Sequence, residues 1–146
     1  MARTVLAAVE DLLFRSKISE TASSLGIEAG FPRNPRRLLE AIHESPPDLL
    51  ILDLNSARFE PLTLLRSVRS DEATRDVPTV GFLSHVQKDL AVAAREAGCD
   101  RVIAAALLRR IFRLGNGWSG YLQLQIVIVD PDRHVHFSIE LLPLYH

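Results

Sequence analysis

Short apolar runs alternate with helical patterns through the first hundred residues, and this alternation limits the fold more than any other feature of the chain. The runs that predict strands are 4–9, 27–31, 49–54, 77–83 and 101–104. The stretches whose apolar residues recur at helical spacing are 12–25, 36–44, 62–68 and 87–97. Strands and helices that alternate with short connections predict an α/β fold, in which helices cover both faces of a parallel sheet.

Composition excludes several other classes of protein. A chain of 146 residues, 47% of them hydrophobic, can bury a core as one domain. Its one cysteine, Cys99, rules out an internal disulfide and a multi-cysteine zinc site. A net charge of −1 argues against a basic nucleic-acid-binding module. Because Glu10 and Asp11 interrupt the first apolar stretch and no later run approaches the ~20 residues that span a bilayer, we expect a soluble, cytoplasmic protein without a membrane partner.

The composition changes near residue 106. Every alanine lies at or before Ala106, whereas the tryptophan and both tyrosines follow it. We therefore divide the chain into an α/β domain at 1–106 and an atypical tail at 107–146. The tail predicts a short arginine-rich helix up to residue 114, a glycine-rich turn at 115–120 and a β-hairpin at 121–141. Both a native extension and an altered reading frame account for this change.

The predicted hairpin has one apolar face. A turn at 130–133 pairs apolar residues across the two strands, because side chains alternate with period two. The pairs are Ile128 with Val135, Ile126 with Phe137, Leu124 with Ile139 and Leu122 with Leu141. An isolated two-stranded ribbon is marginal in water, so this face must pack on the domain or on another subunit. We expect a homodimer formed through the hairpin.

Acidic and hydroxyl residues follow the predicted strands, where parallel sheets collect functional groups. Glu10 and Asp11 follow the first strand, Asp53 closes the third, and Ser84 follows the fourth. Carboxylates brought together repel one another, and a hard divalent cation such as Mg²⁺ would offset that repulsion. An aspartate beside such an ion can accept a phosphoryl group, with Asp53 as the nucleophile.

Four segments, in order and near the expected spacing, resemble the response-regulator receiver domains of bacterial two-component signalling, a family that includes chemotaxis regulators. They are VEDLL at 9–13, PDLLILDLN at 47–55, VPTVGFLSH at 77–85 and AGCDRVIAA at 97–105. The resemblance implies a flavodoxin-like, doubly wound sheet of five parallel strands in the order 2-1-3-4-5. It also implies a non-enzymatic signalling protein whose partner is a sensor histidine kinase or another signalling protein.

The same resemblance assigns the site residues. Asp53 is the phosphoacceptor and Ser84 the switch hydroxyl. Mg²⁺ would be held by Glu10, Asp11, Asp53 and the backbone carbonyl of Asn55.

Departures from the family pattern leave an alternative open. Ala105 and Ala106 occupy the positions of the family's lysine and proline, and Val102 that of its switch aromatic residue. The segment LNSARFEPL after the phosphoacceptor lacks the usual methionine, proline and glycine. Arg101 or Arg109 could supply the missing cation, although an arginine needs a different geometry. The alternative is a pseudo-receiver that acts without phosphorylation, as a dimerisation or binding module through its hairpin.

The site residues also have ordinary structural roles to set against the functional ones. Asp53 could end a strand and cap a turn, and Glu10 and Asp11 could begin the first helix, where negative charge suits the helix dipole. Ser84 could be a helix N-cap. A small flavodoxin-like enzyme is a third class, for which the sequence offers no pair of nucleophile and base.

Overall fold

A computed structural model describes residues 3–24, 26–83, 87–105, 123–129 and 134–140. A five-stranded parallel sheet has the order β2-β1-β3-β4-β5, and β6 and β7 form a separate antiparallel pair. The strands are β1 (Thr4–Ala8), β2 (Glu28–Gly30), β3 (Leu49–Asp53), β4 (Thr79–Leu83), β5 (Arg101–Ala104), β6 (Gln123–Val129) and β7 (His134–Glu140). The helices are α1 (Leu12–Ser24), α2 (Pro35–Glu44), α3 (Pro61–Ser70) and α4 (Lys88–Glu96). The predicted fold class and strand order are confirmed.

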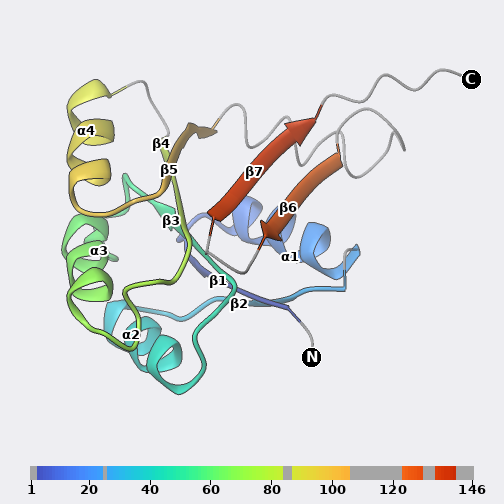
Figure 1. Cartoon of the computed structure of the whole chain (residues 1–146), viewed down its shortest axis with the longest axis horizontal. Helices are drawn as coiled ribbons and strands as arrows, with labels where there is room; N and C mark the ends of the chain where they lie inside the picture. Colours follow the sequence, from blue (N-terminus) through green and yellow to red (C-terminus); the bar gives the residue numbers. More distant parts are fainter. Residues whose placement is uncertain (1–2, 25, 84–86, 106–122, 130–133, 141–146) are drawn as a thin grey trace, which may run out of the picture.

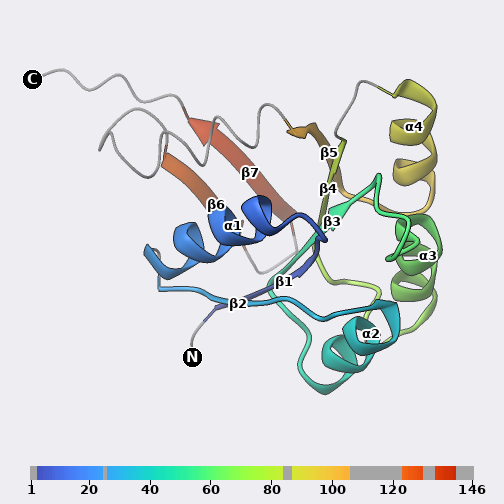
Figure 2. The same ribbon diagram turned by 180° about the vertical axis from the view of Figure 1, so that it is seen from behind.

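Helices cover both faces of the sheet, with α2, α3 and α4 on one side and α1 on the other (Figures 1 and 2). The central strand β3 shows why both faces must be covered. Leu50 and Leu52 belong to the core beneath α2 and α3, whereas Leu49 and Ile51 belong to the core beneath α1. On the α1 side, the rings of Phe14 and Phe82 stack with their centroids 4.6 Å apart. A strand buried on both faces has no polar alternation, which explains the continuous apolar run in the sequence.

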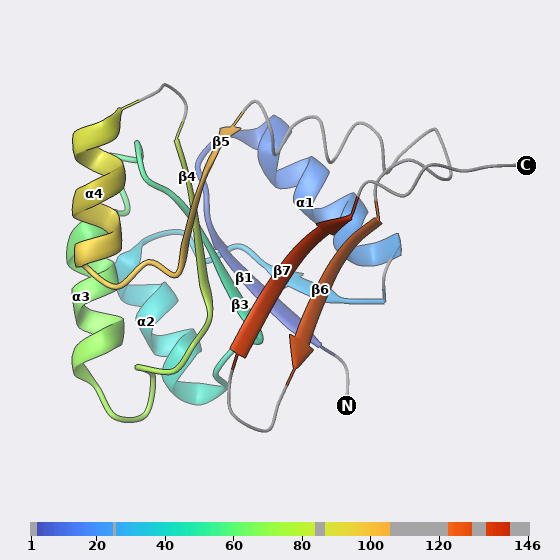
Figure 3. The same cartoon turned by 45° about the horizontal axis from the view of Figure 1, so that its top comes forward.

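The hairpin has the predicted register. Leu124 pairs with Ile139, Ile126 with Phe137 and Ile128 with Val135. Figure 3 shows β6 and β7 on the same side of the sheet as α1. The predicted helix up to residue 114, the glycine-rich turn at 115–120, the turn at 130–133 and the pair of Leu122 with Leu141 lie outside the described residues.

The amino end of β4 is held by Arg69, which uses all five of its N–H groups. They donate to the carbonyl oxygens of Gly98, Arg75 and Val77, to Thr79 Oγ1 and to Asp100 Oδ2. Gly98 has φ of +109°, and a Cβ there would lie 2.5 Å from Arg69 Cγ. Arg69 therefore ties α3 to the starts of β4 and β5, at the end of the sheet opposite Asp53.

Most element bounds differ from the sequence prediction by one or two residues, and two places near β4 and α4 have a structural explanation. The strand β4 begins at Thr79 rather than at residue 77, because Pro78 has no N–H to donate to a neighbouring strand. The N-cap of α4 is Gln87, so the alternative role of Ser84 as the N-cap of this helix is wrong. In the described part of the chain, no helix has both the length and the apolar character needed to cross a membrane.

Candidate functional site

Asp53 ends β3 and lies beside the end of β1, the strand that leads into Glu10 and Asp11. The two strands pair in parallel, with Ala8 opposite Leu52, so the residues that follow them share one edge of the sheet. Burial raises the pKa of Asp53, and the negative charges of Glu10 and Asp11 raise it further. The backbone N–H of Asn55 donates to Asp53 Oδ1 at 2.9 Å and partly opposes that rise in pKa. The structure thus places Glu10 and Asp11 close enough to Asp53 for their charges to raise its pKa.

Asp11 has a structural role as well. Its Oδ1 accepts hydrogen bonds from the backbone N–H groups of Leu13 at 2.8 Å and Phe14 at 3.1 Å. These donors have no partner within the helix, so Asp11 caps α1. Asp11 therefore precedes α1 as its cap, rather than forming part of the first turn as the sequence had suggested, and its Oδ2 takes no part in the capping bonds.

Glu10 is held by the loop that follows β3. The hydroxyl of Ser56 donates to Glu10 Oε2 at 2.6 Å, and Arg58 Nε lies 3.3 Å from Glu10 Oε1. Ser56 is buried, and its Oγ also accepts the backbone N–H of Phe59 at 3.2 Å. Neither Ser56 nor Arg58 was predicted from the sequence as a site residue. They stand three and five residues after Asp53, and a basic residue so close to a predicted acidic site is the signal that could have identified Arg58.

Asn55 links two of the loops at this edge. Its side-chain amide Nδ2 donates to Gln87 Oε1 at 2.5 Å, which joins the loop after β3 to the start of α4. Ser84, the predicted switch hydroxyl, belongs to the connection between β4 and α4 but lies outside the described residues. The structure therefore supports a link between these two loops through Gln87, a residue that the sequence analysis did not single out.

The position of the family's lysine is part of the core. Ala105 is 1% exposed and packs in the cluster beneath α1. Arg101 cannot replace that lysine, because it pairs with Val80 at the amino end of β5, whereas Asp53 lies two strands away at the carboxyl end of β3. The proposal that Arg101 supplies the missing cation is therefore wrong, and Arg109 lies outside the described residues.

The donor set suits a hard cation. Glu10, Asp11 and Asp53 offer carboxylate oxygens, which Mg²⁺ prefers. Burial is the main cause of the raised pKa of Asp53, and a cation would offset the smaller contribution from the charges of Glu10 and Asp11. Among the described residues, however, no three His, Cys, Asp or Glu side chains converge as a group that could hold a metal ion. Glu10 is turned toward Ser56 and Arg58 instead. The residues fit the ion in chemistry and charge, but they are not already assembled around one.

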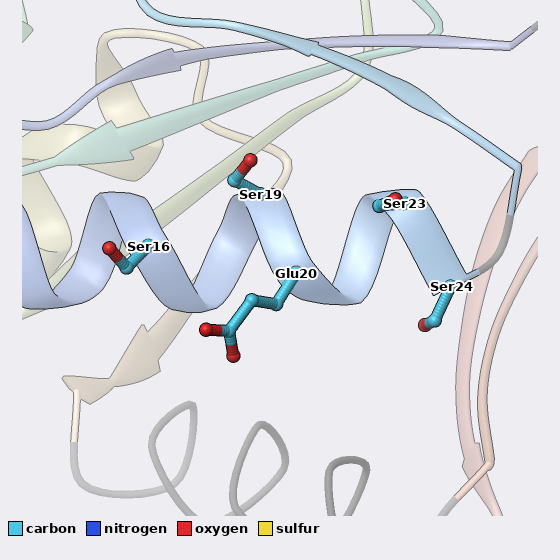
Figure 4. Close-up of a pocket in the computed structure, with 5 residues that line it drawn as sticks. All are labelled: Ser16, Ser19, Glu20, Ser23 and Ser24. Atoms are coloured by element: carbon cyan, nitrogen blue, oxygen red, sulfur yellow. The ribbon is translucent and has the colours of Figure 1, made fainter.

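A hollow of about 530 Å³ lies elsewhere, along α1. Figure 4 shows the residues that line it along this helix. They are Ser16, Ser19, Glu20, Ser23 and Ser24. None of them belongs to the predicted site, so this open hollow is separate from the acidic edge.

Comparisons with known sequences find response regulators, the class of protein that the four sequence segments resemble. The transcriptional regulatory protein PhoB of the phosphate regulon of Pseudomonas aeruginosa is 24% identical over 142 residues, covering 90% of this chain and 62% of PhoB. A protein-glutamate methylesterase/protein-glutamine glutaminase of Myxococcus xanthus is 32% identical over 113 residues, covering 73% of this chain and 32% of the relative. The polar-differentiation response regulator DivK of Brucella anthropi is 21% identical over 104 residues, covering 71% of this chain and 85% of DivK. No family model matches the chain.

Solved structures share the fold. The phosphorylated cyanobacterial phytochrome response regulator RcpA has a TM-score of 0.69 at 18% identity, over 80% of this chain and 91% of RcpA. The Mn²⁺-bound response regulator Rcp1 has a TM-score of 0.67 at 15% identity, over 79% and 90% of the two chains. The magnesium-bound receiver domain of the sensor histidine kinase PA1611 from Pseudomonas aeruginosa has a TM-score of 0.65 at 17% identity. The match covers 77% of this chain and 96% of that domain.

The sheet order, the placement of the helices and the acidic edge define a flavodoxin-like receiver fold. The curated relatives and the solved structures together indicate a response-regulator receiver domain, so the resemblance found in the sequence is confirmed. The chain spans 62% of PhoB and 32% of the methylesterase, and what those whole proteins do is not carried over to it.

Proposed function

We propose that this chain receives a phosphoryl group on Asp53 and passes the signal on through protein contacts, as a cytoplasmic receiver module of two-component signalling. The observation that carries the proposal is the half-buried Asp53 carboxylate at the end of β3, with Glu10 and Asp11 beside it. A carboxylate whose pKa is raised is a stronger base and hence a better nucleophile. In this proposal the receiver-like domain is 1–106, and 107–146 is a tail with a separate contact role.

The reaction needs few groups from the protein. An oxygen of Asp53 forms the new O–P bond while the P–N bond of a phosphohistidine on a sensor kinase breaks, and its electron pair returns to the imidazole nitrogen. The backbone N–H of Asn55, which already donates to Asp53 Oδ1, fixes the orientation of the carboxylate. Ser84 would donate to a phosphoryl oxygen from the connection between β4 and α4.

We propose that Glu10, Asp11, Asp53 and the backbone carbonyl of Asn55 hold a divalent cation during this reaction. The metal ions in Rcp1 and in the PA1611 receiver domain support a divalent cation in a fold of this kind. The cation would neutralise charge on the phosphoryl oxygens. We propose a sensor histidine kinase or another signalling protein as the partner. Transcriptional regulation and methylesterase activity belong to the relatives that bear those names.

Phosphoramidate, a small-molecule donor with the same P–N bond, tests the phosphoacceptor. With Mg²⁺ present, intact-protein mass spectrometry should show one phosphoryl group on the wild type and none on Asp53→Asn. Asp89→Asn is the matched control, because Asp89 is an exposed aspartate in the first turn of α4 and should leave labelling unchanged. Absence of labelling on the wild type would overturn the phosphotransfer proposal and favour the phosphorylation-independent binding module.

A further inference from the structure

We propose that Arg58 is a built-in counter-cation of the acidic edge: its guanidinium competes with a divalent cation for Glu10 and so sets the divalent-cation affinity of this chain. The inference rests on the proposed function, because it concerns the same carboxylates. It adds a residue that the family resemblance does not assign.

The contacts of Glu10 support this role. Oε1 faces Arg58 Nε at 3.3 Å, and Oε2 accepts the Ser56 hydroxyl at 2.6 Å, so both carboxylate oxygens already have a partner within the chain. A guanidinium beside a carboxylate cancels much of the field that would attract a second cation. Among the described residues, the acidic side chains do not converge as a metal-binding group, and Glu10 has these two partners instead.

The two partners of Glu10 differ in how firmly they are placed. Ser56 is 5% exposed, and its Oγ is also bonded to the N–H of Phe59, itself buried in the core. The side chain of Arg58 is 61% exposed, and that of Glu10 is 37% exposed. Exposed ion pairs of this kind are weak and open readily. A cation could therefore displace Arg58 while Ser56 keeps Glu10 beside the loop after β3.

The place of Arg58 in the chain matters as well. The family's lysine position is the buried Ala105, so within the described residues the end of β5 brings no cation to the acidic edge. Arg58 lies instead in the loop after β3, which follows Asp53 directly and also carries Asn55. A positive charge is thus present at the edge, but it pairs with Glu10.

Titration with Mn²⁺ tests the proposal, because electron paramagnetic resonance measures the free ion directly and needs no phosphotransfer. Arg58→Ala and Arg58→Gln should each bind Mn²⁺ about two- to five-fold more tightly than the wild type, the range expected from losing an exposed ion pair. The gain should be absent when Glu10→Gln is present in both proteins compared, since Arg58 then has no carboxylate to neutralise. Because the side chain of Arg58 is largely exposed, both variants should keep the circular dichroism spectrum of the wild type.

Arg36→Ala is the matched control. Arg36 makes a similar exposed pair with Glu40 at 3.2 Å, but on α2. It should leave Mn²⁺ affinity unchanged. Equal affinity in the wild type and both Arg58 variants would overturn the inference and leave the proposed metal site standing. If neither the wild type nor the Arg58 variants bind Mn²⁺, the metal site of the proposed function fails and the inference fails with it.

Discussion

His43 lies near the end of α2, and an oxygen atom lies within hydrogen-bond distance of each of its ring nitrogens. Nδ1 lies 2.7 Å from the carbonyl oxygen of Leu39, and Nε2 lies 2.7 Å from Asp71 Oδ2. Because neither a carbonyl nor a carboxylate can donate, both hydrogen bonds form together only when both ring nitrogens carry protons, so this geometry favours the charged imidazole. The hydrogen bond to Asp71 is the main reason that the pKa of His43 is raised, and the same bond lowers the pKa of Asp71. The sequence analysis did not single out this pair, because the two residues stand 28 positions apart.

The His43 pair makes stability depend on pH. Because the folded-state pKa of His43 is raised, its contribution is fully present below the pKa of an unfolded histidine and is lost as the pH rises through the folded pKa. Because the pKa of Asp71 is lowered, the contribution is also lost in acid, as the pH falls through the folded pKa of Asp71. Urea unfolding of the wild type and His43→Gln should therefore show the largest difference in mildly acidic buffer and a smaller one in alkaline buffer. A difference that grew toward high pH would refute the assignment of a charged His43.

The loop between β3 and α3 carries residues of the candidate site and also contains a strained backbone conformation. Ser56 and Phe59 anchor it to the core, and it ends at Glu60, which has φ of 43° and ψ of 62°. This left-handed conformation costs a non-glycine residue free energy, and strain of this kind gathers near functional sites. Pro61 follows at the first turn of α3. The sequence analysis noted the missing glycine in this segment, but only the backbone shows that Glu60 has adopted a conformation that glycine would favour.

Glu60→Gly should stabilise the protein. Relief of the left-handed strain should exceed the entropy that glycine adds to the unfolded chain, for a net gain of about 1 kcal/mol in the free energy of unfolding. Urea denaturation of the wild type and variant measures this directly. Glu72→Gly is the control, since Glu72 is an exposed residue with negative φ and its replacement should lower stability. If Glu60→Gly were as destabilising as Glu72→Gly, Glu60 would not be strained.

The two ends of the parallel sheet differ: many hydrogen bonds hold one end, and acidic side chains gather at the other. At the amino ends of β4 and β5, Arg69 satisfies five acceptors, including Asp100 Oδ2 at 2.9 Å. At the carboxyl ends of β1 and β3, the carboxylates of Glu10, Asp11 and Asp53 are neighbours, and the pKa of Asp53 is raised. The parallel sheet joins the two ends through a core buried on both faces. The acidic residues therefore lie at the end of the sheet opposite the Arg69 hydrogen bonds.

The hairpin carries a prediction about assembly. Strand alternation places Ile126 on the face that the sequence predicts to be apolar and Gln125 on the other face, and Ile126 pairs with Phe137. If that face forms a homodimer, Ile126→Lys should convert a dimer to a monomer in sedimentation velocity, because a lysine there would bury a charge. Gln125→Lys adds the same charge to the opposite face and should leave the dimer intact. A wild-type monomer at high concentration would contradict the dimer prediction.

The sequence by itself determined the fold class, the strand order through the family resemblance, the hairpin register and the gathering of Glu10, Asp11 and Asp53 at one edge. These features follow from local periodicity and from the rule that parallel strands end together. Only the tertiary structure decided which partner each side chain took. It paired Glu10 with Ser56 and Arg58, placed Arg101 at the wrong end of β5 to act as a cation, and buried Ala105 in the core. The reason is physical: hydrogen bonds and ion pairs depend on ångström-scale distances between residues remote in sequence, and a linear pattern of apolar residues does not contain those distances.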